Sequence, residues 1–357
     1  MLVTAVRGSG FRCYERLELE LDAGLVGVVG PNGAGKTSLV EMIHFGCLAY
    51  SPRTSTESQV VAFGRELTRV EVGAVLAAGP ATVEVGFRPG EPKRVVVDGV
   101  PERSAARLLG RFPVLVFTPD HIRLVQGAPA LRRSYLDRAL VRLWPALADV
   151  PPAYGRALSQ RNHLLRRIRS GRASEDALAP WDEVTARAGE ELIEARRRLC
   201  SRLAPAFAER LTQLGGTPGE ALLRLLPNTE PPDLAAALTE RRRRDVERAA
   251  TGAGPHLDDL ELQEAGHDLR RFGSQGEQRR ALLALILAEA DLLTGERGEQ
   301  PVLLLDDVTG EFDADRRGLL LDAVARFDQA VVTTTDDADL GGRAASLVRV
   351  ASGKLLG

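Results

Sequence analysis

The sequence has few cysteines and no long apolar run. Its 357 residues include three cysteines, Cys13, Cys47 and Cys200, which lie far apart. This spacing fits neither a zinc site nor a disulfide framework, so we expect three free and mostly buried thiols. No window approaches the ~18 uncharged apolar residues of a membrane-spanning helix, and the N-terminus lacks the apolar segment of a signal peptide. We therefore expect a cytoplasmic protein with no membrane partner.

Lysine is also scarce, because only Lys36, Lys93 and Lys354 occur in the whole chain. The basic charge is arginine, and it is unevenly distributed. Residues 126–250 hold 22 Arg and no Lys against 16 Asp or Glu, a balance of +6 in a chain whose net charge is −2. Such asymmetry is expected where one region meets phosphate backbones. Alternatively, the chain simply prefers arginine, and these residues cover solvated helix faces.

A glycine-rich segment follows the apolar run Leu25 to Val29 and fits the P-loop pattern at every fixed position. It consists of Gly30, Pro31, Asn32, Gly33, Ala34, Gly35, Lys36 and Thr37. Glycines let the backbone N–H groups face a phosphate, and the helix that follows directs its positive end at the same anion. We expect this segment to bind a nucleoside triphosphate, with Lys36 at the β- and γ-phosphates as a catalytic residue and Thr37 as a ligand of Mg²⁺.

A second acidic motif follows a buried strand late in the chain. Val302-Leu303-Leu304-Leu305 precede Asp306 and Asp307, which is the Walker B pattern. We expect Asp306 to hold Mg²⁺ and Asp307 to polarise the attacking water as a catalytic residue. Lys36 and Asp306 are 306 − 36 = 270 residues apart. The nucleotide-binding core must therefore be assembled from the two ends of the chain around a large insertion.

The residue patterns predict an α/β protein whose nucleotide-binding head carries a mixed sheet and an antiparallel β subdomain. We assign residues 1–125 and 251–357 to this head and residues 126–250 to an inserted helical, Arg-rich lobe. Helices are predicted at 36–48, 181–214, 275–293 and 316–327, and β-branched or alternating runs predict the strands. Predicted strands include 2–6, 17–21, 25–29, 69–72, 81–85, 94–97, 222–226, 302–305 and 330–334.

Ser274-Gln275-Gly276-Glu277-Gln278 precedes the Walker B strand. Ser274 is suited to cap the helix that begins near Gln275, and the N–H groups of that helix end could meet an anion. Because the P-loop already serves one phosphate tail, this second helix end would be most useful to a partner's nucleotide. We therefore expect Ser274, Gly276 and Gln278 to contribute to ATP binding in a two-fold, head-to-tail dimer. Alternatively, Ser274 is an ordinary helix cap.

The order of these motifs, followed by Gly310-Glu311-Phe312-Asp313, resembles the ATP-binding-cassette family with its signature motif and D-loop. Finer runs resemble the RecF family of bacterial recombination and replication-repair proteins, with a head like that of SMC proteins. These runs are Gly10-Phe11-Arg12-Cys13-Tyr14, Phe117-Thr118-Pro119-Asp120, Gly127-Ala128-Pro129 with Arg132-Arg133, and Gly254-Pro255-His256-Leu257-Asp258-Asp259-Leu260. The resemblance thins between about residues 145 and 250.

Resemblance to RecF implies a weak, DNA-stimulated ATPase that uses ATP and Mg²⁺, dimerises with ATP and binds duplex, gapped or single-stranded DNA. It also implies RecO and RecR as partners in recombinase loading, replication restart and the SOS response. Arg12 resembles the arginine that SMC-type heads bring to the phosphates; alternatively it is an exposed loop cation without a role. The shorter Asp307, where relatives usually have Glu, and the hydroxyls of Thr333-Thr334-Thr335 favour a slow timer or clamp.

Two other classes of function remain open on the sequence. One is an ABC-type ATPase subunit that drives a membrane transporter, against which stand the long insertion and the lack of a clear Q-loop. The other is a scaffold whose ATP is structural. His256 beside Asp258 and Asp259 superficially resembles a metal site, but no further ligand spacing supports one, and we interpret it as a structural or DNA-facing element.

Overall fold

The computed structural model describes residues 1–229, 233–308, 310 and 312–356. The chain forms two compact units. Unit 1 comprises residues 1–122, 210–216 and 274–357, and unit 2 comprises residues 123–209 and 217–273. The segment 251–273, which the sequence led us to place with the head, lies in unit 2 because its strand β10 (Asp259–Glu264) pairs with β9 (Ala221–Leu226).

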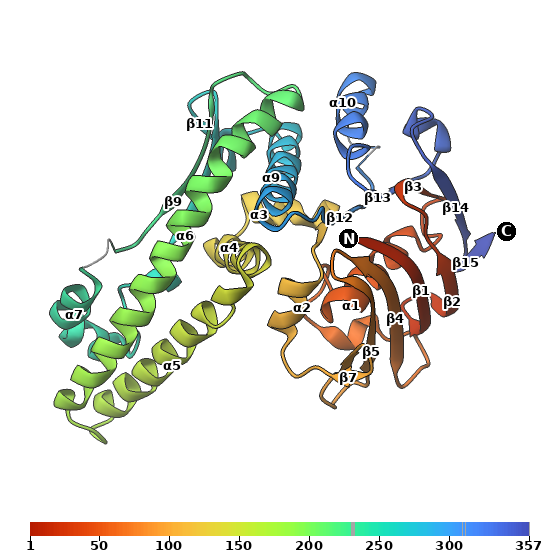
Figure 1. Cartoon of the computed structure of the whole chain (residues 1–357). Coiled ribbons are helices and arrows are strands. Elements are labelled where there is room, and N and C mark those ends of the chain that lie inside the picture. Colours follow the sequence, from red (N-terminus) through yellow and green to blue (C-terminus); the bar gives the residue numbers. More distant parts are fainter. Residues whose placement is uncertain (230–232, 309, 311, 357) are drawn as a thin grey trace. The chain divides into compact units, whose positions relative to one another are not determined.

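A six-stranded sheet in unit 1 combines strands from the N-terminal and the C-terminal parts of the chain (Figure 1). Its strand order is β15-β14-β3-β13-β12-β8, and all neighbours are parallel except the β14–β15 pair. The strands are β3 (Gly24–Val29), β8 (Val114–Phe117), β12 (Val302–Leu305), β13 (Gln329–Thr334), β14 (Ser346–Ala351) and β15 (Lys354–Leu356). The continuous aliphatic runs of β3, β12 and β13 suit strands covered on both faces. The mixed sheet predicted for the head is confirmed.

A second, antiparallel sheet of unit 1 has the order β2-β1-β4-β5-β6-β7. Its strands are β1 (Leu2–Phe11), β2 (Tyr14–Glu20), β4 (Thr68–Leu76), β5 (Gly79–Phe87), β6 (Arg94–Val97) and β7 (Val100–Pro101). Buried and exposed residues alternate along β4, as expected for a sheet with one face on a core and the other toward water. The antiparallel subdomain predicted from the sequence is confirmed.

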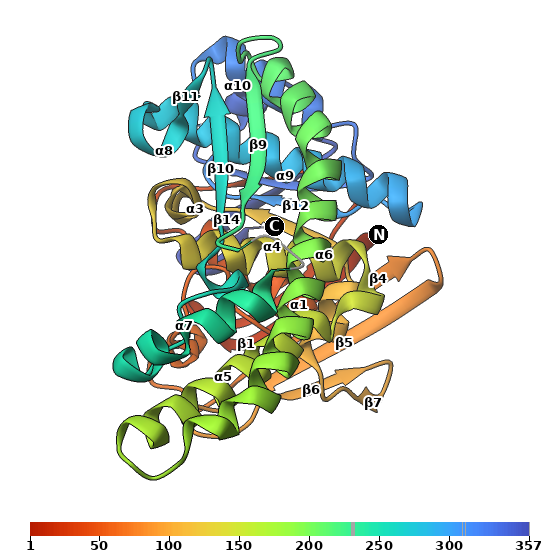
Figure 2. The same cartoon turned by 90° about the vertical axis from the view of Figure 1, so that its left-hand side faces the viewer.

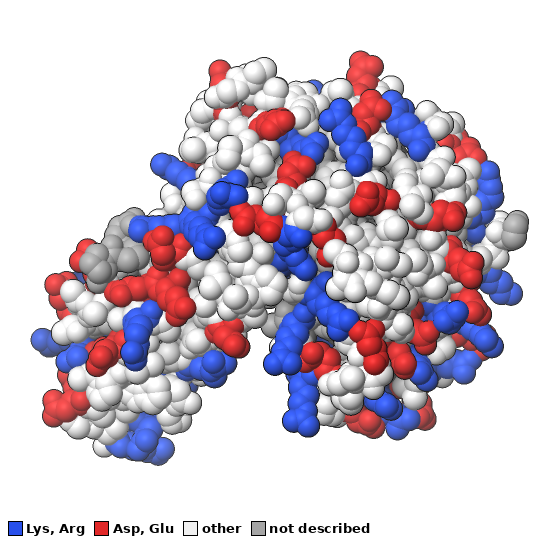
Figure 3. Space-filling view, in the orientation of Figure 1, with Lys and Arg blue, Asp and Glu red and all other residues white. Residues whose placement is uncertain are grey.

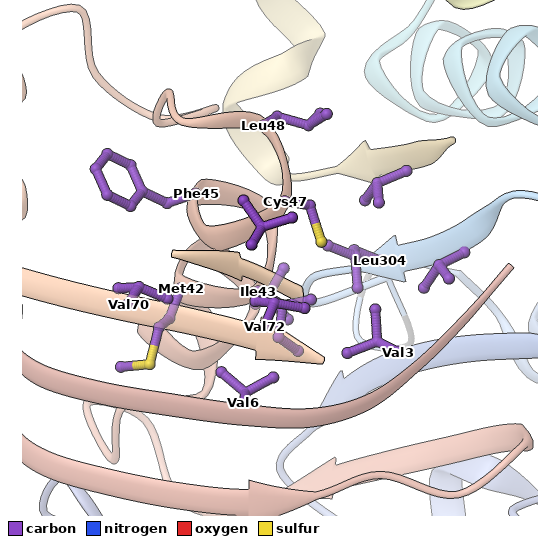
Figure 4. Close-up of a cluster of buried hydrophobic side chains, with 14 of the residues drawn as sticks. Val3, Val6, Met42, Ile43, Phe45, Cys47, Leu48, Val70, Val72 and Leu304 are labelled. Atoms are coloured by element: carbon purple, nitrogen blue, oxygen red, sulfur yellow. The ribbon is translucent and has the colours of Figure 1, made fainter. Parts of the chain in front are cut away.

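Helix α1 (Lys36–Leu48) lies between the two sheets and contacts strands of both. Figure 4 shows its apolar side chains among valines of the antiparallel sheet and Leu304 of the parallel sheet. The approach is close at Gly46, where an added Cβ would lie 2.4 Å from Cγ2 of Val72. On the opposite face of the parallel sheet lie α9 (Gln275–Arg297) and α10 (Ala314–Val324), as Figures 1 and 2 show.

The buried side chain of Gln329, at the start of β13, ties the two sheets together. Its amide accepts a hydrogen bond from Val3 N (2.7 Å) and donates to Val3 O (2.8 Å) and to Asp22 O (2.8 Å). The glutamine therefore satisfies backbone groups at the place where β1 has a register irregularity. This connection fixes the antiparallel sheet against the start of β13.

Unit 2 consists mainly of helices: α3 (Arg123–Gln126), α4 (Pro129–Leu143), α5 (Val150–Arg169), most of α6 (Ala179–Gln213), α7 (Leu234–Arg248) and α8 (Leu269–Phe272). A three-stranded sheet, β11 (His267–Asp268), β10 and β9, completes it. The predicted long helix and the predicted strand near 222–226 are confirmed. The last residues of α6 belong to unit 1, where Arg210 Nε donates to Asp291 Oδ2 of α9 (2.6 Å).

Buried ion pairs hold the helices of unit 2 together. Arg161 of α5 is fully buried and donates to Asp182 of α6 (2.7 Å) and Asp245 of α7 (2.8 Å). A fully buried arginine requires such partners, because removal of either carboxylate would leave a charge without compensation. Part of the arginine content of the lobe is therefore structural, which neither of our two interpretations of its charge had anticipated.

The remaining elements of unit 1 are the helix α2 (Ala105–Arg111) and short 3₁₀ turns. The turns of unit 1 are η1 (Glu57–Val60), η2 (Pro119–Ile122) and η7 (Asp337–Leu340). Unit 2 has three such turns among its described residues, η3 (Pro145–Leu147), η4 (Glu175–Leu178) and η5 (Pro255–Leu257). Cys47 and Cys200 are buried free thiols as expected, whereas Cys13 is exposed. None of the helices that the structure describes combines the length and the apolar character needed to cross a membrane.

Candidate functional site

The predicted P-loop connects β3 to α1. Gly33 and Gly35 have φ values of 78° and 114°, which residues with a side chain rarely adopt. No side chain caps α1, so the N–H groups of its first turn are not taken by a capping hydroxyl or carboxylate. An added Cβ at Gly35 would lie 2.9 Å from the hydroxyl of Tyr14 and 3.0 Å from Sγ of Cys13. Backbone and dipole are therefore arranged to accept a phosphate group.

Lys36 is buried, with 7% of its surface exposed. Its Nζ donates to Gly30 O (2.6 Å) and Pro31 O (3.0 Å), so the ammonium lies against the loop it follows. Burial lowers its pKa, while the nearby carboxylates of Asp307 and Asp306 act in the opposite direction. The charges of both Walker B acids therefore act on the Lys36 ammonium.

Asp306 and Thr37, far apart in sequence, meet at the carboxyl end of the parallel sheet. The Thr37 hydroxyl donates to Oδ1 of Asp306 at 3.0 Å. The Thr333 hydroxyl, from the end of β13, donates to the same Oδ1 at 2.8 Å. Parallel strands bring the residues after them to one edge of a sheet, and this edge is where ligands of α/β proteins bind.

The surroundings of Asp306 fit a divalent cation. Only 2% of the surface of Asp306 is exposed. Burial raises the pKa of its carboxyl, whereas the hydrogen bonds from Thr333 and Thr37 lower that pKa. A buried carboxylate is stabilised by a positive charge, and hydroxyl and carboxylate oxygens are the ligands that Mg²⁺ prefers. Thr37 and Asp306, the residues predicted to hold Mg²⁺, therefore present a suitable pair of oxygen donors.

Asp307 has a left-handed backbone with φ of 55°, and its residue is exposed. Aspartate tolerates this conformation better than most residues but still at a cost of about 1 kcal/mol. Its N–H donates to the Thr333 hydroxyl at 2.9 Å. The backbone thus turns sharply after the Walker B strand and presents the Asp307 side chain to solvent beside the site.

Arg12 lies in the turn between β1 and β2, where its φ is also positive, and it forms a bidentate ion pair with Glu41. Its Nε and Nη2 donate to the two carboxylate oxygens of Glu41 at 2.8 and 2.6 Å, and Nη1 donates to Gln59 O at 2.7 Å. Glu41 is fully buried on α1. These bonds use three of the five N–H groups of the guanidinium, so Arg12 can keep Glu41 and still donate to a further acceptor.

Ser274 caps α9 in a reciprocal arrangement with Glu277. The Ser274 hydroxyl accepts from Glu277 N (3.3 Å), and Oε2 of Glu277 accepts from Ser274 N (2.7 Å) and from the Ser274 hydroxyl (2.9 Å). The backbone N–H of Ser274 is the main cause of a lowered pKa at Glu277. A carboxylate therefore occupies the helix end at which we expected a partner's phosphate.

The other two residues predicted around Ser274 differ in exposure. An added Cβ at Gly276 would meet nothing within 4 Å, so the first turn of α9 is open at this point. Gln278, by contrast, is buried with 4% of its surface exposed. The predicted D-loop falls partly outside the described residues, because residue 311 is not among them.

Three residues of the site were missed by the sequence analysis. Thr333 contacts both Walker B acids, Glu41 holds Arg12, and Arg53 lowers the pKa of Asp306 by its charge and donates to Glu41 Oε2 at 3.1 Å. Thr333 was noted only as one of three successive hydroxyls that favour a slow timer or clamp. Nothing in the spacing of Glu41 or Arg53 distinguishes them from surface charges, because their partners come from other segments.

His256 has both ring nitrogens engaged in unit 2. Nδ1 lies 2.6 Å from the Tyr154 hydroxyl, and Nε2 lies 2.9 Å from Thr251 O. A carbonyl can only accept, so Nε2 carries the proton and Nδ1 accepts from Tyr154. The buried carboxylate of Asp258 accepts from Arg196 Nη1 at 3.2 Å. Among the described residues, no group of three His, Cys, Asp or Glu side chains is arranged to hold a metal.

Comparison with solved structures places the whole chain in one fold. The recombination mediator protein RecF with ATP, from the RecFOR pathway, matches with a TM-score of 0.91 and 28% identity over 99% of this chain and 97% of that one. An Smc head bound to the C-winged helix domain of ScpA matches with a TM-score of 0.59 at 14% identity, which bears on the fold alone. The fold is that of an ABC/SMC-type ATPase head, as predicted.

Comparison with known sequences agrees. Residues 5–101 match the family model described as AAA domain. The DNA replication and repair protein RecF of Symbiobacterium thermophilum is 36% identical over 95% of this chain and 93% of its own length. The protein of the same name from Acidothermus cellulolyticus is 37% identical, with 95% of each chain covered. The chain therefore belongs to the RecF family of DNA replication and repair proteins.

Proposed function

We propose that this protein is an ATP-dependent DNA-binding protein of recombinational repair and replication restart, in which ATP closes a head-to-tail dimer on DNA and slow hydrolysis reopens it. The observation that carries the proposal is the 3.0 Å hydrogen bond between Thr37 and Asp306, which unites the P-loop with the Walker B strand. Membership of the RecF family and similarity to a RecF structure with ATP support ATP as the nucleotide.

Four residues of the P-loop and the Walker B end have a definite task in this proposal. Lys36 exchanges the carbonyls of Gly30 and Pro31 for the β- and γ-phosphates, and Asp307 orients the attacking water. Thr37 and Asp306 would hold Mg²⁺, which would neutralise charge on the phosphates. The short side chain of Asp307 reaches less far than a glutamate would, and this favours slow turnover.

Dimerisation is proposed to use Ser274 and Gly276 of one protomer against the nucleotide in the P-loop of the other. The open first turn at Gly276 gives access to backbone N–H groups. Glu277 must first release Ser274, because its carboxylate is an anion at the same helix end. Exchange of the Glu277 carboxylate for a γ-phosphate would make the capping box a part of the ATP switch.

DNA binding is proposed to involve arginines of unit 2 that make no buried ion pair. Arg166, Arg167, Arg169 and Arg172 are exposed at and just after the C-terminal end of α5. On the face drawn in Figure 3, basic and acidic side chains are interspersed over the described surface. A short cluster of arginines is therefore a sharper candidate than the general charge of the lobe, and its phosphate contacts should weaken steeply with salt.

The partner proteins RecO and RecR, recombinase loading and a contribution to the SOS response are proposed from family membership. Membership of the RecF family gives no support to the transporter-type ATPase subunit that the sequence left open. Retention on DNA rather than on a membrane protein distinguishes the two.

The decisive experiment sizes the wild-type protein with ATP, with ADP, and with ATP plus gapped DNA. We expect a dimer only with ATP and a larger complex when DNA is added. Lys36→Met should abolish turnover, and Asp307→Asn, which keeps a residue tolerant of positive φ, should trap the ATP dimer. DNA affinity that is indifferent to ATP and salt would refute the clamp, and turnover that survives both substitutions would refute the assigned residues.

A further inference from the structure

Thr333 occupies a position that neither the P-loop nor the Walker B pattern specifies. In the parallel register Leu305 of β12 pairs with Val332 of β13, so the next residue on each strand, Asp306 and Thr333, come side by side. Thr333 is fully buried. Its hydroxyl is therefore held in a fixed place by the sheet and is protected from exchange with water.

The Thr333 hydroxyl acts as a hydrogen-bond donor and as an acceptor at the same time. It donates to Oδ1 of Asp306 at 2.8 Å and accepts from Asp307 N at 2.9 Å. A hydroxyl can do both at once, whereas an amide nitrogen or a methyl group cannot. The first bond orients the carboxylate expected to hold Mg²⁺, and the second holds the left-handed backbone that presents Asp307.

Both threonine hydroxyls around Asp306 donate to the same oxygen. Thr37 and Thr333 each contact Oδ1, so Oδ2 takes part in neither bond. Two hydroxyl donors therefore hold Oδ1 of Asp306 in place. If Thr333 were apolar, Thr37 would be the single hydroxyl to orient Asp306, and the N–H of Asp307 would lose its acceptor.

We propose that Thr333 is a positioning residue for ATP hydrolysis, which sets the Asp306 carboxylate and the Asp307 backbone through one shared hydroxyl. This inference rests on the proposed ATPase function. Residues that orient the ligands of a metal typically change metal affinity or activity by about 10- to 100-fold when they are replaced. Binding of the triphosphate itself depends on the P-loop and should change little.

Three variants separate the hydroxyl from the shape of the side chain. Thr333→Val removes the hydroxyl and keeps β-branching, and Thr333→Ser keeps the hydroxyl. Thr68→Val is the matched control, because Thr68 is a fully buried strand residue of unit 1 whose hydroxyl donates to Ser9 O (3.1 Å), away from the Walker B end. All three are compared with the wild type for melting temperature, nucleotide affinity, kcat and the Mg²⁺ concentration for half-maximal rate.

We expect Thr333→Val to lower kcat and to raise the Mg²⁺ concentration for half-maximal rate, and the product of the two changes should be about 10- to 100-fold. The affinity for ATP should stay within about threefold of the wild type. Thr333→Ser should restore both, and Thr68→Val should change neither. Amide hydrogen exchange at Asp307 provides a readout without nucleotide, and it should be faster in Thr333→Val but not in Thr333→Ser.

Normal kcat and Mg²⁺ dependence in Thr333→Val would overturn the proposal. A serine variant as defective as the valine variant would also overturn it, because shape rather than the hydroxyl would then matter. If the wild-type protein fails to hydrolyse ATP, the proposed function falls, and the exchange rate at Asp307 still decides whether Thr333 orders the Walker B end.

Discussion

The hydroxyl of Thr37 donates to Oδ1 of Asp306 at 3.0 Å across a sequence separation of 269 residues. The bond joins the first turn of α1 to the end of β12 and thereby closes the nucleotide site. It exists because β3 and β12 flank β13 in one parallel sheet, so that the loops after them emerge at the same edge.

Replacement of these two residues should show that they act together. We expect Thr37→Val and Asp306→Asn each to abolish the gain in nucleotide affinity that Mg²⁺ provides, and the double variant to be no worse than the more severe single one. A coupling energy of about 0.5–3 kcal/mol is typical of residues that share an interaction. Calorimetric titration of a slowly hydrolysed ATP analogue, with Mg²⁺ and with EDTA, measures it. Additive losses would contradict a shared site.

Ser274 offers a test of the proposed dimer. Ser274→Arg should leave monomeric ATP binding near normal and block ATP-dependent dimerisation, because a bulky cation would occupy the position of the partner's phosphate. Ser274→Ala removes only the cap and should cost about 1 kcal/mol of helix stability. Sedimentation with and without ATP distinguishes them from Asp307→Asn, which should remain dimeric. A dimer that persists in Ser274→Arg would rule out the shared nucleotide site.

Gly46 offers a test of how closely α1 approaches the antiparallel sheet. An added Cβ would lie 2.4 and 2.8 Å from the branched side chains of Val72 and Val70. Gly46→Ala should therefore destabilise the protein by about 1–3 kcal/mol, although alanine is the better helix former. The matched control is Gly295 on α9, where an added Cβ meets nothing within 4 Å. Urea unfolding should show Gly295→Ala to be neutral or stabilising; equal losses would contradict the close approach.

His256 should make unit 2 sensitive to mild acid. Burial is the main cause that lowers its pKa below the usual 6.5. The unfolded chain therefore takes up a proton near pH 6.5 while the native form resists it. The resulting stability is present above pH 6.5 and is lost as pH falls through the lowered native pKa. Melting temperatures of the wild type and His256→Gln, whose amide can replace both hydrogen bonds without titrating, should diverge as pH falls through this window, with the wild type the less stable at its acid end. A difference that is independent of pH would contradict the prediction.

Much of the fold follows from local patterns. Apolar runs predicted β3, β12 and β13, and the P-loop spacing predicted the start of α1, because glycine conformations and helix caps depend on neighbouring residues. The segment 251–273 was harder to place, since whether it pairs with strands of the head or with β9 is a matter of long-range register. The lobe's arginines likewise could not be divided into buried and exposed sets, because Arg161 is compensated by carboxylates from two other helices.

Local motifs were enough to predict the reactive groups of the site: a phosphate loop with Lys36 and Thr37, the acids Asp306 and Asp307, and a serine-capped helix at Ser274. Each is a contiguous motif whose residue types are set by local backbone geometry. The contacts of Thr333 with both acids and of Glu41 with Arg12 became visible only in the folded chain. These contacts arise from strand register and helix packing, which join segments that no local pattern connects.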